Sequence, residues 1–338
     1  MIMTIEEIEK ACDRSVPLDF SRHPLEAPAL SLQRTFYPMG FPTELRTNSA
    51  EIIQAAESAW GIFDQRFNTQ PILVDVHLIE SDSTECPPTP EYRFLPPVFM
   101  AVADSNNYSI FDLSRNTTQI VISRAALRHP LYLHYFFLDN AGGCHIATRF
   151  TTPLHAACVA LDGHGVLLCG DSGAGKSTLS YACARAGWTY VSDDSTFLLN
   201  CKAAERTVIG NCHQVRFRPT AVELFPEIEG LEVTPRAAGK PSIELPTANL
   251  AHMACARHAK IDSIVFLNRS TETLPELLPY RVDIARHYIR QELYGSRESL
   301  ARQYAAIEHL MAAEIFELRY SDLDWAVDRL RTLVREGR

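Results

Sequence analysis

One octapeptide constrains this 338-residue chain more than any other feature. Residues 170–177 read Gly-Asp-Ser-Gly-Ala-Gly-Lys-Ser, which matches the phosphate-loop pattern G-x-x-x-x-G-K-[ST]. Its three glycines permit the positive φ angles that let a backbone approach an anion with no Cβ in the way. Successive N–H groups then point into one concavity, and a helix beginning near Lys176 adds its positive end. The octapeptide therefore predicts a binding site for a nucleoside triphosphate or a similar polyphosphate.

The flanking residues agree with that reading. Residues 165–169 form a short apolar run typical of a buried strand, and residues 176–186 have the composition of a helix that stops at Gly187. Lys176 would bring a mobile charge to the outer phosphates, and the Ser177 hydroxyl would bind Mg²⁺. We therefore expect ATP and Mg²⁺ as cofactors, with GTP and pyrophosphate as the alternative phosphoryl donors. The predicted nucleotide-contacting residues are Gly170, Asp171, Ser172, Gly173, Ala174, Gly175, Lys176, Ser177 and Thr178.

Two carboxylates follow the next apolar run. Asp193 and Asp194 come directly after residues 188–192, a segment that we expect to form a strand beside the phosphate-loop strand. Carboxylates at such a strand end can hold Mg²⁺ or accept a hydroxyl proton, although an Asp-Asp turn between two strands has the same sequence. His155 lies between apolar residues, and a lone histidine in that setting is more often a hydrogen-bonded core or edge residue than a catalytic one.

Three basic residues are weaker candidates for phosphate or acceptor contacts. Arg216 and Arg218 alternate in residues 215–219 and would share one face of a strand, but a solvated strand face looks the same. Lys240 lies in a predicted loop that could close over a terminal phosphate, and a solvated loop lysine is the alternative.

Taken together, these residues resemble the catalytic core of HPr kinase/phosphorylase. His155 precedes Gly170 by fifteen residues, the loop reads Gly-Asp-Ser-Gly-Ala-Gly-Lys-Ser, and Val-Ser-Asp-Asp ends at Asp194, eighteen residues beyond Lys176. The resemblance covers about residues 145–225. It implies a fold shared with the phosphoenolpyruvate carboxykinase catalytic domain, with Asp194 as general base toward a hydroxyl and His155 supporting it. It also implies Lys176 acting on the phosphates and Ser177 on Mg²⁺. From its place at a strand end, Asp193 is the second predicted metal ligand.

The chain departs from that family at several positions. Thr178 stands where those enzymes usually carry glutamate, and their later glutamate-bearing signature is replaced by residues 208–215, which contain no acid. Glu223 is a weak substitute for that second metal ligand. We therefore expect a relative that acts on a small molecule, peptide or other protein and not on HPr.

The remainder of the chain predicts an α/β protein of two domains. Residues 1–143 are expected to form a smaller α+β domain for recognition or assembly, and residues 144–338 the kinase-like catalytic domain. In the first domain, residues 99–123 contain three β runs separated by turn residues, which predicts an antiparallel meander. Asn48 with Glu51 resembles a capping box that would start a helix.

The net charge and the composition limit the classes of partner and the cellular compartment that we expect. A formal net charge of −9 disfavours nucleic acids and anionic membranes, and no apolar run approaches the ~20 residues of a membrane span. The first nine residues carry acids and no basic segment, so no signal peptide is expected. Nine scattered cysteines suit free thiols in a cytoplasmic protein. The family resemblance also implies a possible homo-oligomer.

These features predict an ATP- and Mg²⁺-dependent kinase whose acceptor is a hydroxyl on an unidentified molecule. The alternative is a nucleotide-gated binding module that transfers nothing, which the missing glutamate signature favours. An ordinary phosphate-loop ATPase ranks last. That class expects a second apolar strand ending in an acid, and residues 261–267 are followed by Asn268 instead.

Overall fold

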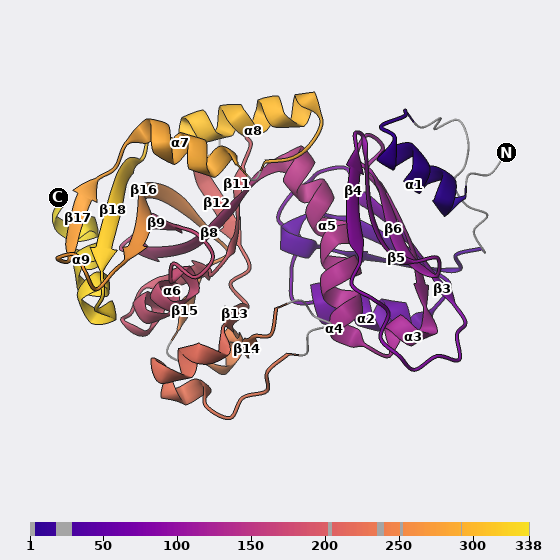
Figure 1. The fold of residues 1–338 in the computed structure, drawn as a ribbon, viewed down its shortest axis with the longest axis horizontal. Coiled ribbons are helices and arrows are strands. Elements are labelled where there is room, and N and C mark those ends of the chain that lie inside the picture. The colour runs from indigo at the N-terminus through magenta and orange to yellow at the C-terminus, as the bar shows by residue number, and fades with distance from the viewer. Residues whose placement is uncertain are drawn as a thin grey trace. The chain divides into compact units, whose positions relative to one another are not determined.

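The computed structural model describes residues 4–17, 29–201, 205–234, 240–250, 253–291 and 293–337. It is a mixed α/β protein with several sheets, and its contacts divide it into two compact units (Figure 1). Met1–Thr148 forms most of the first unit, and the second comprises Arg149–Thr234 with Pro241–Arg338. No helix among the described residues is long and apolar enough to span a bilayer.

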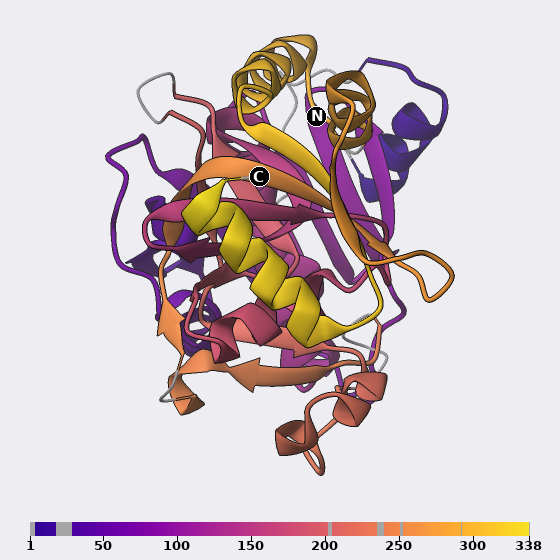
Figure 2. The same ribbon diagram turned by 90° about the vertical axis from the view of Figure 1, so that its left-hand side faces the viewer.

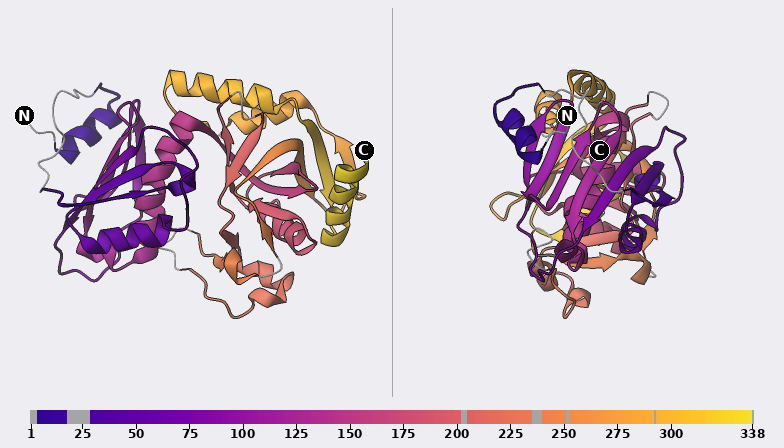
Figure 3. Two further views of the ribbon diagram at one scale, coloured as in Figure 1. Left: turned by 180° about the vertical axis from the view of Figure 1, so that it is seen from behind. Right: turned by 90° about the vertical axis from the view of Figure 1, so that its right-hand side faces the viewer.

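The first unit contains a seven-stranded sheet with the order β1-β2-β3-β7-β6-β5-β4. Its strands are β1 Leu32–Phe36, β2 Thr43–Thr47, β3 Ile72–Ile79, β4 Glu91–Leu95, β5 Val98–Asp104, β6 Asn107–Asp112 and β7 Thr117–Ser123. Its helices are α1 Ile5–Asp13, α2 Ala50–Trp60, α3 Arg124–Leu127, α4 Pro130–Leu133 and α5 Asp139–His145, with wider helical turns at His134–Leu138 and Ile146–Phe150. Figure 3 shows these strands from behind in indigo to purple.

The predicted meander in this unit is confirmed, since β5, β6 and β7 pair antiparallel in sequence. Side chains alternate across it. Met100 contacts the α1 cluster, whereas Phe99 faces the other way and packs with Phe111 and Cys144 of α5. The alternation puts α1 and α5 on opposite faces of the meander.

The predicted start of α2 is wrong by one residue. Ser49, not Asn48, is the N-cap, and its hydroxyl accepts a hydrogen bond from the Glu51 N–H. Asn48 instead exchanges two hydrogen bonds of 2.9 Å with the backbone of Leu78 at the end of β3. An asparagine side chain resembles a peptide group, and here it pairs with a strand instead of a helix end.

The second unit is built on a nine-stranded sheet. Its strands are β8 Thr151–Leu161, β9 His164–Cys169, β10 Thr189–Ser192, β11 Ser195–Leu199, β12 Thr207–Gly210, β15 Ala254–Cys255, β16 His258–Arg269, β17 Glu276–Pro279 and β18 Glu314–Tyr320. A separate ribbon pairs β13 Gln214–Phe217 with β14 Ile243–Pro246. The helices are α6 Lys176–Arg185, α7 Val282–Arg290, α8 Arg297–Leu310 and α9 Leu323–Glu336, with 3₁₀ turns at Pro219–Glu223, Pro226–Ile228 and Thr247–Asn249.

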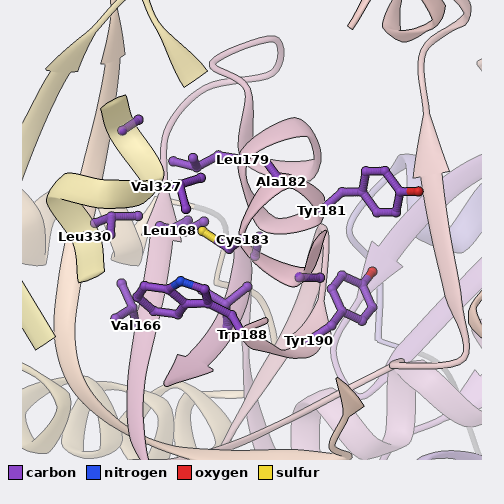
Figure 4. Close-up of a cluster of buried hydrophobic side chains, with 14 of the residues drawn as sticks. Val166, Leu168, Leu179, Tyr181, Ala182, Cys183, Trp188, Tyr190, Val327 and Leu330 are labelled. Atoms are coloured by element: carbon purple, nitrogen blue, oxygen red, sulfur yellow. The ribbon is translucent and has the colours of Figure 1, made fainter. Parts of the chain in front are cut away.

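Strand β9 lies between β8 and β16 and is covered on both faces. Val166 and Leu168 point toward α6 and α9, where they pack with Trp188 and Leu330 (Figure 4). Leu167 and Cys169 point the other way, into the cluster under α7 and α8. Figure 2 shows α9 in yellow, lying along one side of this unit. Burial on both faces explains why the sequence of β9 is continuously apolar and not alternating.

The predicted placement of residues 188–192 is wrong in one respect. They do form a strand, β10, but it does not pair with β9. The long strand β8 lies between them and is antiparallel to both. Because the β8–β9 connection is a tight hairpin, β8 occupies the neighbouring position that the sequence reading gave to β10.

Candidate functional site

The candidate site lies where β9, β16 and β18 end. These strands are parallel, so their carboxyl ends meet at one edge of the sheet. Cys169 ends β9 and leads directly into a glycine loop, residues 170–175, which in turn leads into α6. Strand, loop and helix therefore follow in the order that the motif requires.

The loop depends on its glycines. Gly170, Gly173 and Gly175 have φ angles of +151°, +96° and +98°, in the region that residues with a Cβ rarely adopt. Gly175 is also the N-cap of α6 and has no side chain to cap it. The Tyr320 hydroxyl donates a 3.4 Å hydrogen bond to the Ala174 carbonyl, so β18 supports the loop from outside. Nothing in the sequence singles out Tyr320, which the sequence reading did not identify.

Lys176 and Ser177 occupy the first turn of α6. The Lys176 ammonium is buried, and it donates hydrogen bonds to the carbonyls of Gly170 (2.7 Å) and Asp171 (3.3 Å). The Ser177 hydroxyl donates to the Asp193 carbonyl over 3.4 Å. The loop and the Asp-Asp pair, sixteen residues apart in sequence at this contact, therefore meet in space.

Strand register brings His155 to the same place. Ala156 of β8 pairs with Cys169, the last residue of β9, while His155 itself pairs with Ser195 of β11. His155 is therefore next to both the start of the glycine loop and Asp194. Its Nδ1 lies 3.5 Å from the Asp194 carboxylate, and both side chains are partly exposed to solvent.

Asp193 points into a more enclosed setting than Asp194. Its carboxylate accepts a 2.6 Å hydrogen bond from the backbone N–H of Arg216 and is also hydrogen-bonded to Tyr190. Burial raises the pKa of Asp193 to about 7, and the negative charge of Asp194 adds to that rise, while the bond from Arg216 opposes it. The two adjacent carboxylates thus differ in environment, one enclosed and one open to solvent.

The three basic candidates, Arg216, Arg218 and Lys240, have different surroundings. The Arg216 guanidinium donates to the Ser242 hydroxyl over 2.6 Å and lies 3.3 Å from Glu244 on β14, so its backbone and not its charge meets Asp193. Arg218 directly follows the last residue of β13, has extended backbone angles and is exposed. Lys240 is exposed and follows residues outside the described part of the chain.

A small cavity of about 60 Å³ adjoins His155. Asp171 of the glycine loop and Cys169 line one side of it, and residues near the end of α7, among them Tyr288 and Gln291, line another. His155 and the beginning of the glycine loop therefore share one opening within the second unit.

The site offers oxygen atoms, which are the ligands that Mg²⁺ prefers. The Ser177 hydroxyl contacts the backbone carbonyl of Asp193, whose carboxylate belongs to the same residue, and Mg²⁺ usually takes one or two protein oxygens together with phosphate and water. Within the described residues, no three His, Cys, Asp or Glu side chains gather as a metal cage. Glu223 ends a 3₁₀ turn, is exposed, and makes no hydrogen bond with Ser177 or Asp193 there.

Comparison with known proteins gives three findings. A family model described as "SynChlorMet cassette protein ScmC" matches residues 144–237, the stretch that contains the glycine loop and the Asp-Asp pair. No curated protein matches the chain. Among solved structures, the HPr(Ser) kinase/phosphatase from Coxiella burnetii is similar at 14% identity and a TM-score of 0.32, over 55% of this chain and 96% of that one.

Proposed function

We propose that this chain is a phosphotransferase that uses ATP with Mg²⁺ to phosphorylate a hydroxyl of a small molecule, peptide or protein. The single observation that carries the proposal is the meeting of Ser177 with Asp193 beside the Asp194–His155 pair. A phosphate cradle, oxygen ligands and a solvent-open carboxylate at one edge are the parts that phosphoryl transfer needs. The resemblance of His155, residues 170–177 and residues 191–194 to HPr kinase/phosphorylase supports the same reading.

Each residue has a role in this proposal. The N–H groups of the glycine loop and the Lys176 ammonium bind the phosphates, and Ser177 and Asp193 hold the metal ion. Mg²⁺ would neutralise charge on the phosphates when bound. Asp194 accepts the proton of the acceptor hydroxyl. The hydroxyl oxygen then forms its bond to the terminal phosphorus of ATP, while the bond between that phosphorus and the leaving ADP oxygen breaks. His155 orients Asp194 through their 3.5 Å contact.

The acceptor is expected to approach from the side of His155. A cavity of about 60 Å³ opens there, beside His155 and the start of the glycine loop. As a separate part of the proposal, the first unit would supply acceptor recognition or assembly into a homo-oligomer.

Substitution of Asp194 tests the proposal. Asp194→Asn is expected to lower phosphoryl transfer at least ~10²-fold, because the amide cannot take the proton, and to leave ADP affinity within ~3-fold. Transfer is measured from γ-labelled ATP to the metabolite and peptide fractions of a cell extract, and affinity by calorimetry. Asp328→Asn, which changes an exposed acid on α9, is the matched control and should change neither quantity. Lys176→Ala should weaken both.

Two outcomes would contradict the proposal. Full transfer by the Asp194 variant would remove that residue as the base. Binding of ADP by the wild-type protein without transfer or hydrolysis of ATP would instead favour a nucleotide-gated binding module.

A further inference from the structure

Two groups outside the glycine loop hold the Asp193 carboxylate. Its Oδ2 accepts a 2.6 Å hydrogen bond from the Arg216 N–H of β13, and the carboxylate is also hydrogen-bonded to the Tyr190 hydroxyl. The same hydroxyl donates to the Gln214 carbonyl over 2.9 Å. A carboxylate has about four lone-pair sites, so these two donors leave room for a metal ion on the same group.

A break in the pairing of β10 brings Tyr190 and Asp193 together. Residues three apart on a regular strand point to opposite faces of the sheet. In β10, however, the register against β8 shifts between Tyr190 and Ser192. Such a β-bulge redirects the side chains that follow it. Asp193 follows the bulge directly and returns to the side of the Tyr190 hydroxyl.

The position of the Tyr190 hydroxyl is fixed by burial. Strand β10 has a partner strand on each side, with Val159 of β8 and Cys255 of β15 opposite Tyr190. The ring is fully buried in the apolar cluster that also contains Trp188 (Figure 4). Burial raises the pKa of the Tyr190 hydroxyl well above its ordinary value, so the hydroxyl keeps its proton and remains a donor.

The Tyr190 proton has one charged acceptor and one neutral acceptor. A hydrogen bond to a carboxylate is roughly twice as strong as one between neutral groups. The neutral acceptor, the Gln214 carbonyl, belongs to β13, which also supplies the Arg216 N–H. Tyr190 and β13 therefore form one hydrogen-bonded frame around the Asp193 carboxylate, at the place where the Asp193 carbonyl meets Ser177.

We propose that Tyr190 is a positioning residue that orients the Asp193 carboxylate toward Mg²⁺. The inference rests on the proposed function, because it takes Asp193 as a metal ligand. It adds a residue that acts only through Asp193, since the fully buried Tyr190 ring cannot reach a nucleotide or an acceptor. Hydrogen-bonding partners of carboxylate ligands commonly contribute ~10- to 100-fold to metal affinity.

Calorimetric titration with ADP, in excess Mg²⁺ and again in EDTA, tests the inference. The ratio of the two affinities measures how strongly the metal ion supports ADP binding, whereas misfolding lowers both affinities alike. Tyr190→Phe keeps the ring and removes the hydroxyl. This variant should lower the ratio ~10-fold, and it should leave the affinity in EDTA within ~2-fold of the wild-type value.

Tyr181→Phe is the matched control. Tyr181 is fully buried in the same cluster, and its hydroxyl also donates to a carboxylate, that of Glu227, over 3.2 Å (Figure 4). The control variant therefore removes the same atom from the same core without touching Asp193. Both ADP affinities, and their ratio, should stay at the wild-type values.

A double variant separates positioning from a merely structural role. Asp193→Asn should by itself remove most of the Mg²⁺ effect on ADP affinity. Adding Tyr190→Phe should then change the ratio by less than ~2-fold, because the hydroxyl acts through a carboxylate that is already absent.

The outcomes distinguish this inference from the proposed function. Equal ratios in the wild-type and Tyr190→Phe proteins, or a full further loss in the double variant, would overturn the positioning role and leave the proposed function in place. A wild-type protein that binds no ADP, or binds it without any effect of Mg²⁺, would instead overturn the proposed function and the positioning role with it.

Discussion

Gly175 illustrates how one residue controls the geometry of the candidate site. Its φ angle of +98° disfavours any side chain, and a Cβ there would lie 2.7 Å from the Tyr320 hydroxyl. That hydroxyl also supports the loop through the Ala174 carbonyl. A single methyl group would therefore strain the backbone and displace its support.

Gly175→Ala is expected to abolish measurable ADP binding and to lower the free energy of unfolding by about 1–3 kcal/mol. Calorimetry and urea unfolding measure the two effects. Gly187→Ala is the matched control, because Gly187 has a similar φ of +89° with no atom within 4 Å of the added Cβ. It should show a comparable loss of stability with normal ADP binding. Normal binding by Gly175→Ala would contradict the role given to the loop.

At the scale of elements, the start of α2 shows how one helix is fixed to its sheet. Ser49 caps the helix, and Asn48 pairs with both polar backbone groups of Leu78 at the end of β3. The cap acts within the helix, whereas the asparagine joins two elements thirty residues apart. Removing the Asn48 side chain and removing the Ser49 hydroxyl should therefore lower the free energy of unfolding by different amounts.

Asn48→Ala is expected to lower the free energy of unfolding by about 2–3 kcal/mol, because it leaves two partly buried backbone groups without their partner. Ser49→Ala should cost about 1 kcal/mol, the usual value of a helix cap. Urea unfolding of the full chain, followed by circular dichroism, compares the two. An equal or larger cost for Ser49→Ala would show that the asparagine does not connect α2 to β3.

At the scale of the whole molecule, stability depends on what each unit buries. The second unit buries a large apolar cluster around β9, and the first unit buries, besides its apolar core, His77 on β3, which is only 3% exposed. Burial lowers the pKa of His77, and Arg46 lowers it further, while Asp75 acts in the opposite direction. The folded protein therefore holds this imidazole neutral at a pH where the unfolded chain takes up a proton.

This difference predicts acid sensitivity. As the pH falls below about 6.5, the unfolded state gains a proton that the folded state does not, so the free energy of unfolding decreases. His77→Leu should remove that part of the decrease between pH 7 and pH 5. Urea unfolding at pH 7 and at pH 5 measures this change in the free energy of unfolding. The control is His164→Leu, at an exposed histidine, and should keep the wild-type pH dependence. An unchanged dependence in His77→Leu would exclude the buried imidazole as its source.

Local sequence patterns determined much of this protein. The apolar run, the glycines and the helical residues around positions 165–187 specify a strand, a loop and a helix, because each depends mainly on the conformational preferences of neighbouring residues. The turn residues between β5, β6 and β7 likewise specify the meander. Candidate site residues, Lys176 and Asp194 among them, could also be selected from the sequence, because they lie in or near a recognisable local motif.

Only the tertiary structure decided which of those residues meet. His155 lies beside Asp194 because β8 pairs with β11 in one register, and a shift of one residue would turn its side chain away. The Arg216 N–H reaches Asp193, and the Tyr320 hydroxyl reaches the glycine loop, from strands 23 and 146 residues away. The periodicity of a segment indicates which of its faces is buried. Strand order and register, however, depend on how all the elements pack around one core, so the sequence alone does not determine these contacts.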